Sequence, residues 1–385
     1  MTPIADIEAV VLRAPESDPS DLDSSSETLV VRIRDEDGRE GIGEADAPAR
    51  VVQELVLMAD LHGWSRGVRG MLLGRDPFEI GALHRELYEA TIYHGRRGLG
   101  IHALSAVDVA LHDLAGKQLG RPVYQLLGGA CRPAVRPYAT IYPGAVGDRT
   151  IGELMDDIAR RFERALELGF RAVKMEVFFG ELVTDRELVR CIEEGRRLLG
   201  DDITLLVDFG YRWEDWRAAL WALNRLEDCN LYLAEATLRH DDLDGHAKLA
   251  GRVETRIGGA EMAATRFECR EWIEHGGVDV LQPDVNRCGG LTEMAHIAAL
   301  ADLAGVLVVP HGWKTGITAA AARHLQAATP NVPYVEHLSP DLYDSALRRD
   351  LVSPEPIVTD GEIELPTAPG LGIELDGDAV ARYRA

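Results

Sequence analysis

The chain has 385 residues, of which 46% are hydrophobic and 27% charged, so it can fill a large core and is not disordered as a whole. Its 64 acidic and 41 basic residues give a formal charge of -23, which argues against nucleic acid or an anionic membrane as a partner. No run of about 18 apolar residues, no basic leader and no CxxC pair among the five cysteines occur, so we expect a cytoplasmic protein with reduced thiols.

The first half of the chain predicts strands and then helices. Strands are expected at Ile7–Arg13 and Thr28–Arg34, the second followed by the turn sequence Asp-Glu-Asp-Gly at 35–38. From about residue 51 the pattern becomes helical, and it is clearest at 103–119, where apolar residues recur every three and four positions.

After residue 133, short β-branched runs alternate with helical stretches. The predicted strands are 135–141, 172–176, 204–208, 231–235, 256–259, 278–282, 306–309 and 334–336. Their starts recur every 22 to 37 residues, which indicates parallel βα units. Seven or eight such units suggest a closed barrel, although an open sheet has the same rhythm. The residues from Pro354 onward are expected to leave the barrel.

Acidic residues end three consecutive predicted strands. Asp208 closes LLVD, Glu235 closes LAE and Glu261 closes IGGAE, at separations of 27 and 26 residues, one βα unit each. The C-terminal ends of barrel strands converge on one face, so the three carboxylates would form an oxygen-rich site suited to Mg²⁺ or Mn²⁺. The alternative is that each acid only caps the helix that follows it.

The next two strands end in an acid and an imidazole. Asp284 ends LQPD, and His311 ends VVPH 27 residues later. A carboxylate beside an imidazole orients the ring and raises its basicity, which predicts a general acid/base dyad. The alternative is a loop histidine with no chemical role.

Further ionisable residues lie at strand ends. Lys174 and Glu176 are two positions apart in AVKME and so share one face of the second predicted strand. Lys174 is suited to hold a substrate carboxylate or, if its pKa is lowered, to act as a base, and Glu336, at the last strand, to hydrogen-bond the substrate. The alternatives are that Lys174 and Glu176 form a pair of surface charges and that Glu336 caps a helix. Lys314, three residues after His311, is either a contact for an anionic substrate or a solvated loop lysine.

Together these motifs resemble those of the enolase superfamily, in its mandelate racemase-like subgroup. The segment SAVDVALHDLAGKQLGRPVYQLLGG at 105–129 is similar to the joint between cap and barrel in that family, and QPDVNRCGG at 282–290 is similar to its sixth-strand motif. The resemblance covers essentially the whole chain. It implies that the acidic trio is the metal-binding set and that the Asp284–His311 pair is the dyad of this subgroup.

The resemblance also implies a fold and a chemistry. We expect an α/β protein in which an N-terminal α+β capping domain, residues 1–128 completed by 354–385, lies over a modified TIM barrel, (β/α)7β, at 129–353. The implied chemistry is abstraction of a proton α to a carboxylate, with Mg²⁺ stabilising the developing charge.

One position departs from the family pattern. Many members of the subgroup carry Lys-x-Lys on the second strand, where the second lysine is a base facing the dyad histidine, whereas this chain has Lys174-Met175-Glu176. A racemase needs two opposed bases, but dehydration needs only one. The departure favours dehydration with His311 as base, although Glu176 could be a base itself, contact a substrate hydroxyl or pair with Lys174.

We therefore expect a Mg²⁺-dependent lyase that dehydrates a sugar acid to a 2-keto-3-deoxy acid. The alternatives are a racemase, epimerase or cycloisomerase acting on a hydroxy acid, and a non-catalytic, metal-bound sugar-acid binding protein. The expected partner is a small-molecule carboxylate, with chains assembled as a homo-oligomer. Loops at 15–27 and 45–65 are expected to set specificity.

Overall fold

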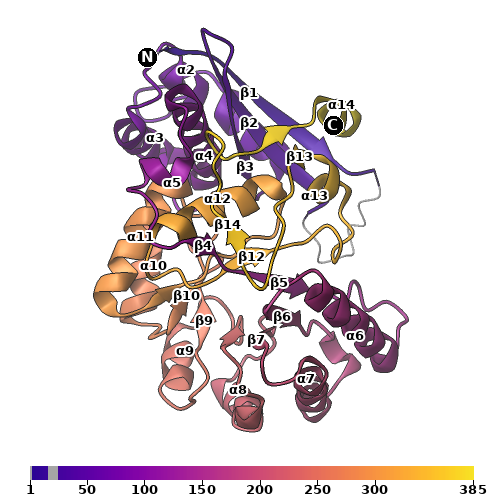
Figure 1. Cartoon of the computed structure of the whole chain (residues 1–385). Helices are drawn as coiled ribbons and strands as arrows, with labels where there is room; N and C mark the ends of the chain where they lie inside the picture. Colours follow the sequence, from indigo (N-terminus) through magenta and orange to yellow (C-terminus); the bar gives the residue numbers. More distant parts are fainter. Residues whose placement is uncertain (1, 16–24) are drawn as a thin grey trace.

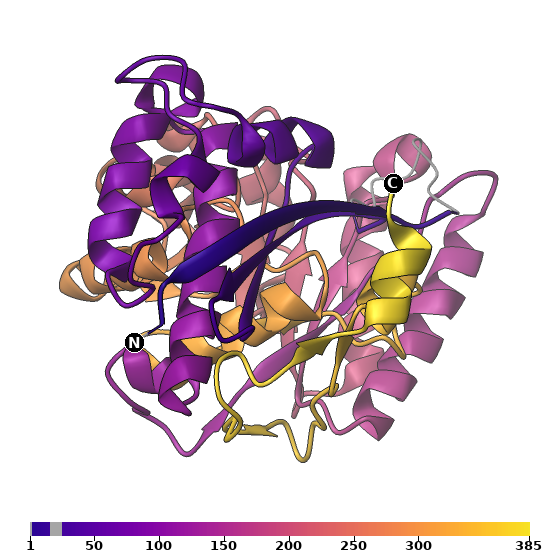
Figure 2. The same cartoon turned by 90° about the horizontal axis from the view of Figure 1, so that it is seen from above.

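The computed structural model describes residues 2–15 and 25–385, in which an N-terminal cap lies against a β/α barrel (Figure 1). Figure 2 shows the same arrangement seen from above, with the cap toward the viewer. Most of the loop predicted at 15–27 lies outside the described residues. Among those that are described, no helix is long and apolar enough to cross a membrane.

The cap begins with an antiparallel sheet in the order β1-β2-β3. The two predicted strands are confirmed as β1 (Ile4–Arg13) and β2 (Glu27–Asp35), and the predicted turn leads into β3 (Glu40–Ala45). The helices that follow are α1 (Ala49–Leu57), α2 (Val68–Leu72), α3 (Ile80–Gly95), α4 (Leu99–Leu119) and α5 (Val123–Leu126).

Helix α4 contains the helix predicted at 103–119 and is buried along most of its length. It packs against β3 on one side and against the barrel helix α11 (Gly290–Ala304) on the other. Gly43 permits the first contact, because a Cβ atom there would lie only 2.0 Å from the backbone oxygen of Ala106. This buried helix is therefore one of the connections between the sheet and the barrel.

The barrel follows the (β/α)7β pattern, which confirms the expected fold class. Its strands are β5 (Pro137–Ile141), β6 (Ala172–Glu176), β7 (Thr204–Asp208), β8 (Leu233–Glu235), β9 (Gly258–Gly259), β10 (Val280–Leu281), β11 (Leu307–Val308) and β12 (Val335–His337). The intervening helices are α6 (Ile151–Glu167), α7 (Asp185–Leu199), α8 (Trp216–Leu223), α9 (Leu243–Ala250), α10 (Thr265–Glu274), α11 and α12 (Gly316–Ala328), with 3₁₀ turns at Gly180–Leu182 and Glu227–Cys229.

The barrel strands form two parallel groups. One has the order β12-β5-β6-β7-β8 and the other β11-β10-β9, and a bridge between Ala234 and Ile257 joins them. The predicted bounds of β6 and β7 are confirmed. The strands predicted in the second group are only two residues long; at β9, for example, Ile257 N donates to the Asp279 side chain (2.9 Å). Side-chain acceptors thus take the place of part of the ladder there.

The C-terminal segment leaves the barrel, as predicted, and returns to the cap. It contains α13 (Ala346–Asp350), β13 (Val352–Ser353), β14 (Ile363–Glu364), β15 (Glu374–Leu375) and α14 (Gly377–Tyr383). β14 pairs with β4 (Ala134–Val135), β13 pairs with β15, and Ala385 N donates to Val11 O of β1 (3.1 Å). The exact domain boundaries at 128/129 and 353/354 stay a prediction.

Candidate active site

A cavity of about 220 Å³ lies at the strand ends that face the cap. Its lining residues are Tyr142, Glu176, Phe178, Asp208, Gly210, Tyr211, Glu261, Met262, Arg287, His311 and Trp313. Half of the predicted site residues are in this set, and the others are buried beside them. A wider cavity of about 860 Å³ adjoins it and shares Phe178, Gly210, Tyr211, Glu261 and Met262. A third, of about 490 Å³ between α3, α10 and α11, contains none of the predicted residues.

The three predicted metal ligands lie at neighbouring strand ends. Asp208 and Glu235 are the last residues of β7 and β8 and pair with each other in parallel register, and Glu261 follows β9 by two residues. The helix-cap alternative is wrong for all three, because α8, α9 and α10 begin at other N-cap residues.

Burial and mutual repulsion oppose ionisation of two members of this trio. Burial raises the pKa values of Asp208 and Glu235; Lys174 opposes that rise and the neighbouring carboxylates add to it. At Glu261 burial also raises the pKa, but His311 above all outweighs it and holds the pKa below its usual value. The Oε2 atom of Glu235 is buried without a hydrogen-bond partner, which is costly unless a cation or proton balances it.

This donor set fits a hard divalent cation. Carboxylate oxygens are the ligands that Mg²⁺ prefers, and a cation here would relieve the repulsion and satisfy Glu235. As the described side chains stand, no group of three or more His, Cys, Asp or Glu residues converges closely enough to hold a metal ion. The Lys174 ammonium lies among the same acids, with its Nζ 3.0 Å from Glu235 Oε1 and 3.5 Å from Asp208 Oδ2.

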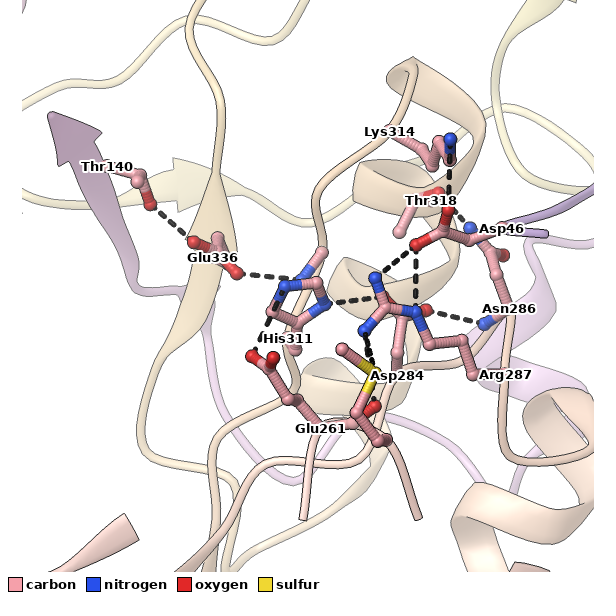
Figure 3. Close-up of polar contacts among 12 residues, drawn as sticks. Asp46, Thr140, Glu261, Asp284, Asn286, Arg287, His311, Lys314, Thr318 and Glu336 are labelled. Carbon is pink, nitrogen blue, oxygen red and sulfur yellow. Dashed lines mark hydrogen bonds and ion pairs between the residues drawn. The ribbon is translucent and has the colours of Figure 1, made fainter. Parts of the chain in front are cut away.

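His311 and Asp284 form the predicted pair (Figure 3). The Nδ1 atom of His311 lies 2.6 Å from Asp284 Oδ2, and Asp284 Oδ1 accepts from Asn286 N at 2.7 Å, which fixes the carboxylate. The other ring nitrogen, Nε2, lies 3.6 Å from Glu261 Oε2. Burial and Arg287 lower the pKa of His311, but Glu261 and the Asp284 hydrogen bond outweigh them and raise it to about 9. The predicted contact between the two residues is therefore present, and the acid/base role of His311 stays a prediction.

The other predicted residues surround Lys174. Its Nζ lies 2.8 Å from Glu336 Oε1, and Glu336 also accepts from Thr140 Oγ1 (2.5 Å) and Gly312 N (2.7 Å), so it is not a helix cap. Glu176 lies opposite Asp208 in the ladder between β6 and β7, and it lines the cavity. Its Oε2 atom is buried without a hydrogen-bond partner. Lys174 and Glu176 are both buried, so the surface-pair alternative is wrong.

Sequence reasoning missed Tyr211 and Thr140. The hydroxyl of Tyr211 donates to Glu261 Oε1, and burial is the main reason that the pKa of this phenol is raised. Tyr211 comes three residues after Asp208, on the loop that leaves a predicted metal-binding strand, and that position was the available signal. Thr140 precedes the end of β5 by one residue and carries no motif of its own.

Arg287 and Lys314 are also part of the site region, and both bind Asp46 at the end of the cap sheet (Figure 3). Arg287 Nε lies 2.8 Å from Asp46 Oδ2, and Lys314 Nζ lies 2.9 Å from Asp46 Oδ1. Lys314 is buried, so the solvated-lysine alternative is wrong. Arg287 stood within the quoted sixth-strand motif, but nothing local in the sequence pointed to its cap partner.

A capped (β/α)7β barrel with an acidic trio, a His–Asp dyad and a buried lysine at one mouth defines an enzyme of the enolase superfamily. Comparison with known proteins identifies the group within it. Residues 9–128 match the mandelate racemase / muconate lactonizing enzyme N-terminal domain, and residues 157–379 match the enolase C-terminal domain-like family. The chain belongs to the mandelate racemase / muconate lactonizing enzyme group of this superfamily.

Relatives within the group carry out more than one reaction. A D-galactarolactone cycloisomerase from Agrobacterium fabrum is 33% identical over 92% of this chain and 91% of its own. A D-gluconate dehydratase from Thermoproteus tenax is 31% identical over 100% of this chain and 75% of its own. A solved racemase structure from Streptomyces coelicolor A3(2) with bound magnesium is 28% identical, has a TM-score of 0.84 and covers 99% of this chain and 100% of its own.

Proposed function

We propose that this enzyme dehydrates a sugar acid to a 2-keto-3-deoxy acid. The observation that carries the proposal is the His311–Asp284 pair at a cavity whose second-strand position holds Glu176 instead of a second lysine. The similarity to a gluconate dehydratase supports the same reaction class.

The proton transfers belong to His311. Asp284 accepts from Nδ1, and Nε2 of the neutral ring would take the proton from the α-carbon of the substrate acid. Because the charge of Glu261 raises the pKa of His311, a cation held by Glu261 would favour this neutral form. The electron pair of that C–H bond forms the double bond as the hydroxyl leaves the β-carbon. The same Nε2 then returns its proton to the departing hydroxyl, which leaves as water, and the enol product tautomerises to the 2-keto acid. One base is sufficient for the whole sequence.

The remaining residues bind and orient the acid. Lys174 would turn from its carboxylate partners to a substrate carboxylate, and Glu336, fixed by Thr140 and Gly312 N, would accept or share a hydrogen bond with the substrate oxygens. Asp208, Glu235 and Glu261 would hold Mg²⁺, which supplies positive charge beside the substrate carboxylate and so favours loss of the α-proton. The buried Glu176 would contact a substrate hydroxyl.

A second candidate is isomerisation, either cycloisomerisation or racemisation. Glu176 favours it, because this residue lines the same cavity as His311 and has an oxygen without a hydrogen-bond partner, as a second base would. Similarity to a galactarolactone cycloisomerase supports this reaction to the same degree as the dehydratase supports the first.

The two candidates are distinguished by one substrate screen with two readouts. Purified protein with Mg²⁺ is incubated with a library of open-chain, lactone and anhydro sugar acids. Semicarbazide-reactive 2-keto product identifies the dehydratase and its substrate. Deuterium at the α-carbon in D₂O without loss of water identifies the isomerase. Ligand binding by calorimetry with neither product would support the binding-protein alternative and contradict both proposals.

Three finer points stay predictions. Mn²⁺ is the alternative cation for the site, which activity of the metal-free protein reloaded with each ion would test. A homo-oligomer is expected, which light scattering would test. A cytoplasmic location is expected from the sequence, which fractionation of the source cells would test.

A further inference from the structure

The strands that carry the dyad have short hydrogen-bonded ladders. β10, which precedes Asp284, pairs with β9 and with β11 over two residues each, whereas β6 and β7 pair over five. Beyond the strand ends, Asp284 and His311 form one further isolated bridge. The backbone ladder therefore does little to fix the loops on which the two dyad residues lie.

A second set of contacts joins these loops. Arg287 and Lys314 each come three residues after a dyad residue, and both bind Asp46 of the cap. Each carboxylate oxygen of Asp46 has its own cation, Oδ2 the guanidinium and Oδ1 the ammonium. The side chains are only 6%, 11% and 3% exposed for Asp46, Arg287 and Lys314, so solvent screens these contacts little.

Asp46 is itself held in the cap. Its backbone oxygen accepts from His102 Nδ1 of α4 at 2.7 Å, and it follows the last residue of β3. Lys314 reaches a second cap strand, because its Nζ also donates to the backbone oxygen of Glu27, the first residue of β2, at 2.9 Å. The two barrel loops are thus fastened to a buried and well-connected part of the cap.

We propose that Asp46 is a positioning residue, which holds the loops of Asp284 and His311 in mutual register through Arg287 and Lys314. The cap then determines the geometry of the base from a residue that does not touch it. The kinetic part of this inference rests on the proposed function, whereas its structural part does not.

The physical reason is the buried charge. If Asp46 loses its charge, two buried cations remain with a single neutral amide between them, and such groups must move apart or admit water. Either movement displaces a loop three residues from Asp284 or His311. A displacement of about 1 Å at a proton-transfer site can lower a rate by about 100-fold.

The first test needs no substrate. The Nδ1 proton of His311 lies in a short hydrogen bond to Asp284 and should give a far-downfield proton NMR signal in the full-length protein, assigned by its loss in His311→Asn. We expect Asp46→Asn to shift this signal upfield or broaden it. The matched control is Thr292→Val, which removes another bond between cap and barrel, Thr292 Oγ1 to Asp108 Oδ2 (2.5 Å), away from the dyad. An unchanged signal in folded Asp46→Asn would overturn the proposal.

The second test uses the substrate found in the screen. Asp46→Asn is expected to lower kcat by about 10- to 100-fold with less than a threefold change in KM, Asp46→Glu to recover part of that loss, and Thr292→Val to leave kcat unchanged. An equal loss in Asp46→Glu and Asp46→Asn, or a change confined to KM, would contradict a positioning role.

A further variant covers the case in which Asp46→Asn does not fold. Lys314→Met removes one cation and leaves the Asp46–Arg287 pair intact, so one buried carboxylate and one buried cation remain paired. We expect the same NMR signal to shift in the same direction by a smaller amount. A wild-type signal in this variant would also overturn the proposal. Absence of turnover in the wild type would contradict the proposed function alone.

Discussion

The two groups of barrel strands differ in how their charged side chains are held in place. In the group β12-β5-β6-β7-β8, longer ladders hold the strand ends, and Lys174 lies among Asp208, Glu235 and Glu336 within the barrel itself. In the group β9-β10-β11, the ladders are two residues long. The two cations on the loops that follow, Arg287 and Lys314, bind Asp46 of the cap. Two of the proposed metal ligands, Asp208 and Glu235, thus lie at the ends of longer ladders, whereas the third, Glu261, and the Asp284–His311 pair follow the short strands.

The largest effect is expected at His311, on the loop that follows β11 of the second group. His311→Asn removes the base and should lower kcat by about 10²- to 10⁴-fold, because positioned proton transfer contributes about that much. Mg²⁺ binding by calorimetry should persist. The control is His275→Asn, an exposed histidine that also has a carboxylate neighbour, Glu271 at 3.4 Å. A His311→Asn enzyme with wild-type kcat would falsify the assignment of the base.

In the first group, Glu235→Gln should weaken Mg²⁺ binding. Loss of a supporting group around a metal costs about 10- to 100-fold in affinity, and loss of a ligand should cost at least as much. The expected calorimetric result is a higher Kd with an unchanged circular dichroism spectrum. Glu194→Gln, on the exposed face of α7, is the control. Equal Kd values for Glu235→Gln and wild type would remove Glu235 from the metal-binding set.

The second group of strands depends on the cap, so the packing within the cap is tested by introducing strain there. Gly43→Ala places a Cβ against the Ala106 backbone oxygen and should destabilise the protein by about 1–3 kcal/mol, as overpacking generally does. Gly81→Ala, in α3 with open space around the added atom, should be neutral or stabilising by about 0.4–1 kcal/mol. Urea denaturation measures both. If the two variants had the same stability, the close approach of β3 to α4 would not matter.

The smallest effect concerns a contact at the edge of the first group. Glu355 binds Arg348 through both oxygens, at 2.6 and 2.8 Å, and His337 at the end of β12. Burial raises the pKa of Glu355, but hydrogen bonds from His337 and Arg348 outweigh it and lower the pKa to about 2. The carboxylate therefore stabilises the fold above its unfolded pKa of about 4.3, and this contribution is lost as the pH falls toward about 2.

The measurement is the difference in unfolding free energy between wild type and Glu355→Gln. Because the side chain is partly exposed, solvent screening limits the expected difference at pH 7 to about 1 kcal/mol. It should shrink as the pH is lowered below about 4.3. Exposed Glu364→Gln is the control. A difference that grew on acidification would contradict the assigned direction of the pKa shift.

The order of the barrel and the position of the acids were predictable because both follow from local spacing. Strand ends recur at each βα unit, so Asp208, Glu235 and Glu261 could be placed together from their separations alone. The partner of Arg287 could not be found in this way. Asp46 lies 241 residues away, on a strand whose own pattern shows only that it belongs to a sheet. The sequence pattern overestimates the length of short strands such as β9. The backbone N–H of Ile257, which the pattern assigns to a ladder, donates instead to the Asp279 side chain.

The position of Lys174 has a consequence for substitutions at this residue. Its ammonium lies within 3.5 Å of three buried carboxylates, those of Asp208, Glu235 and Glu336. A neutral side chain in its place would leave these carboxylates facing one another in the interior of the barrel, and their repulsion would oppose folding. The lysine that is proposed to bind the substrate carboxylate is therefore also needed for the fold.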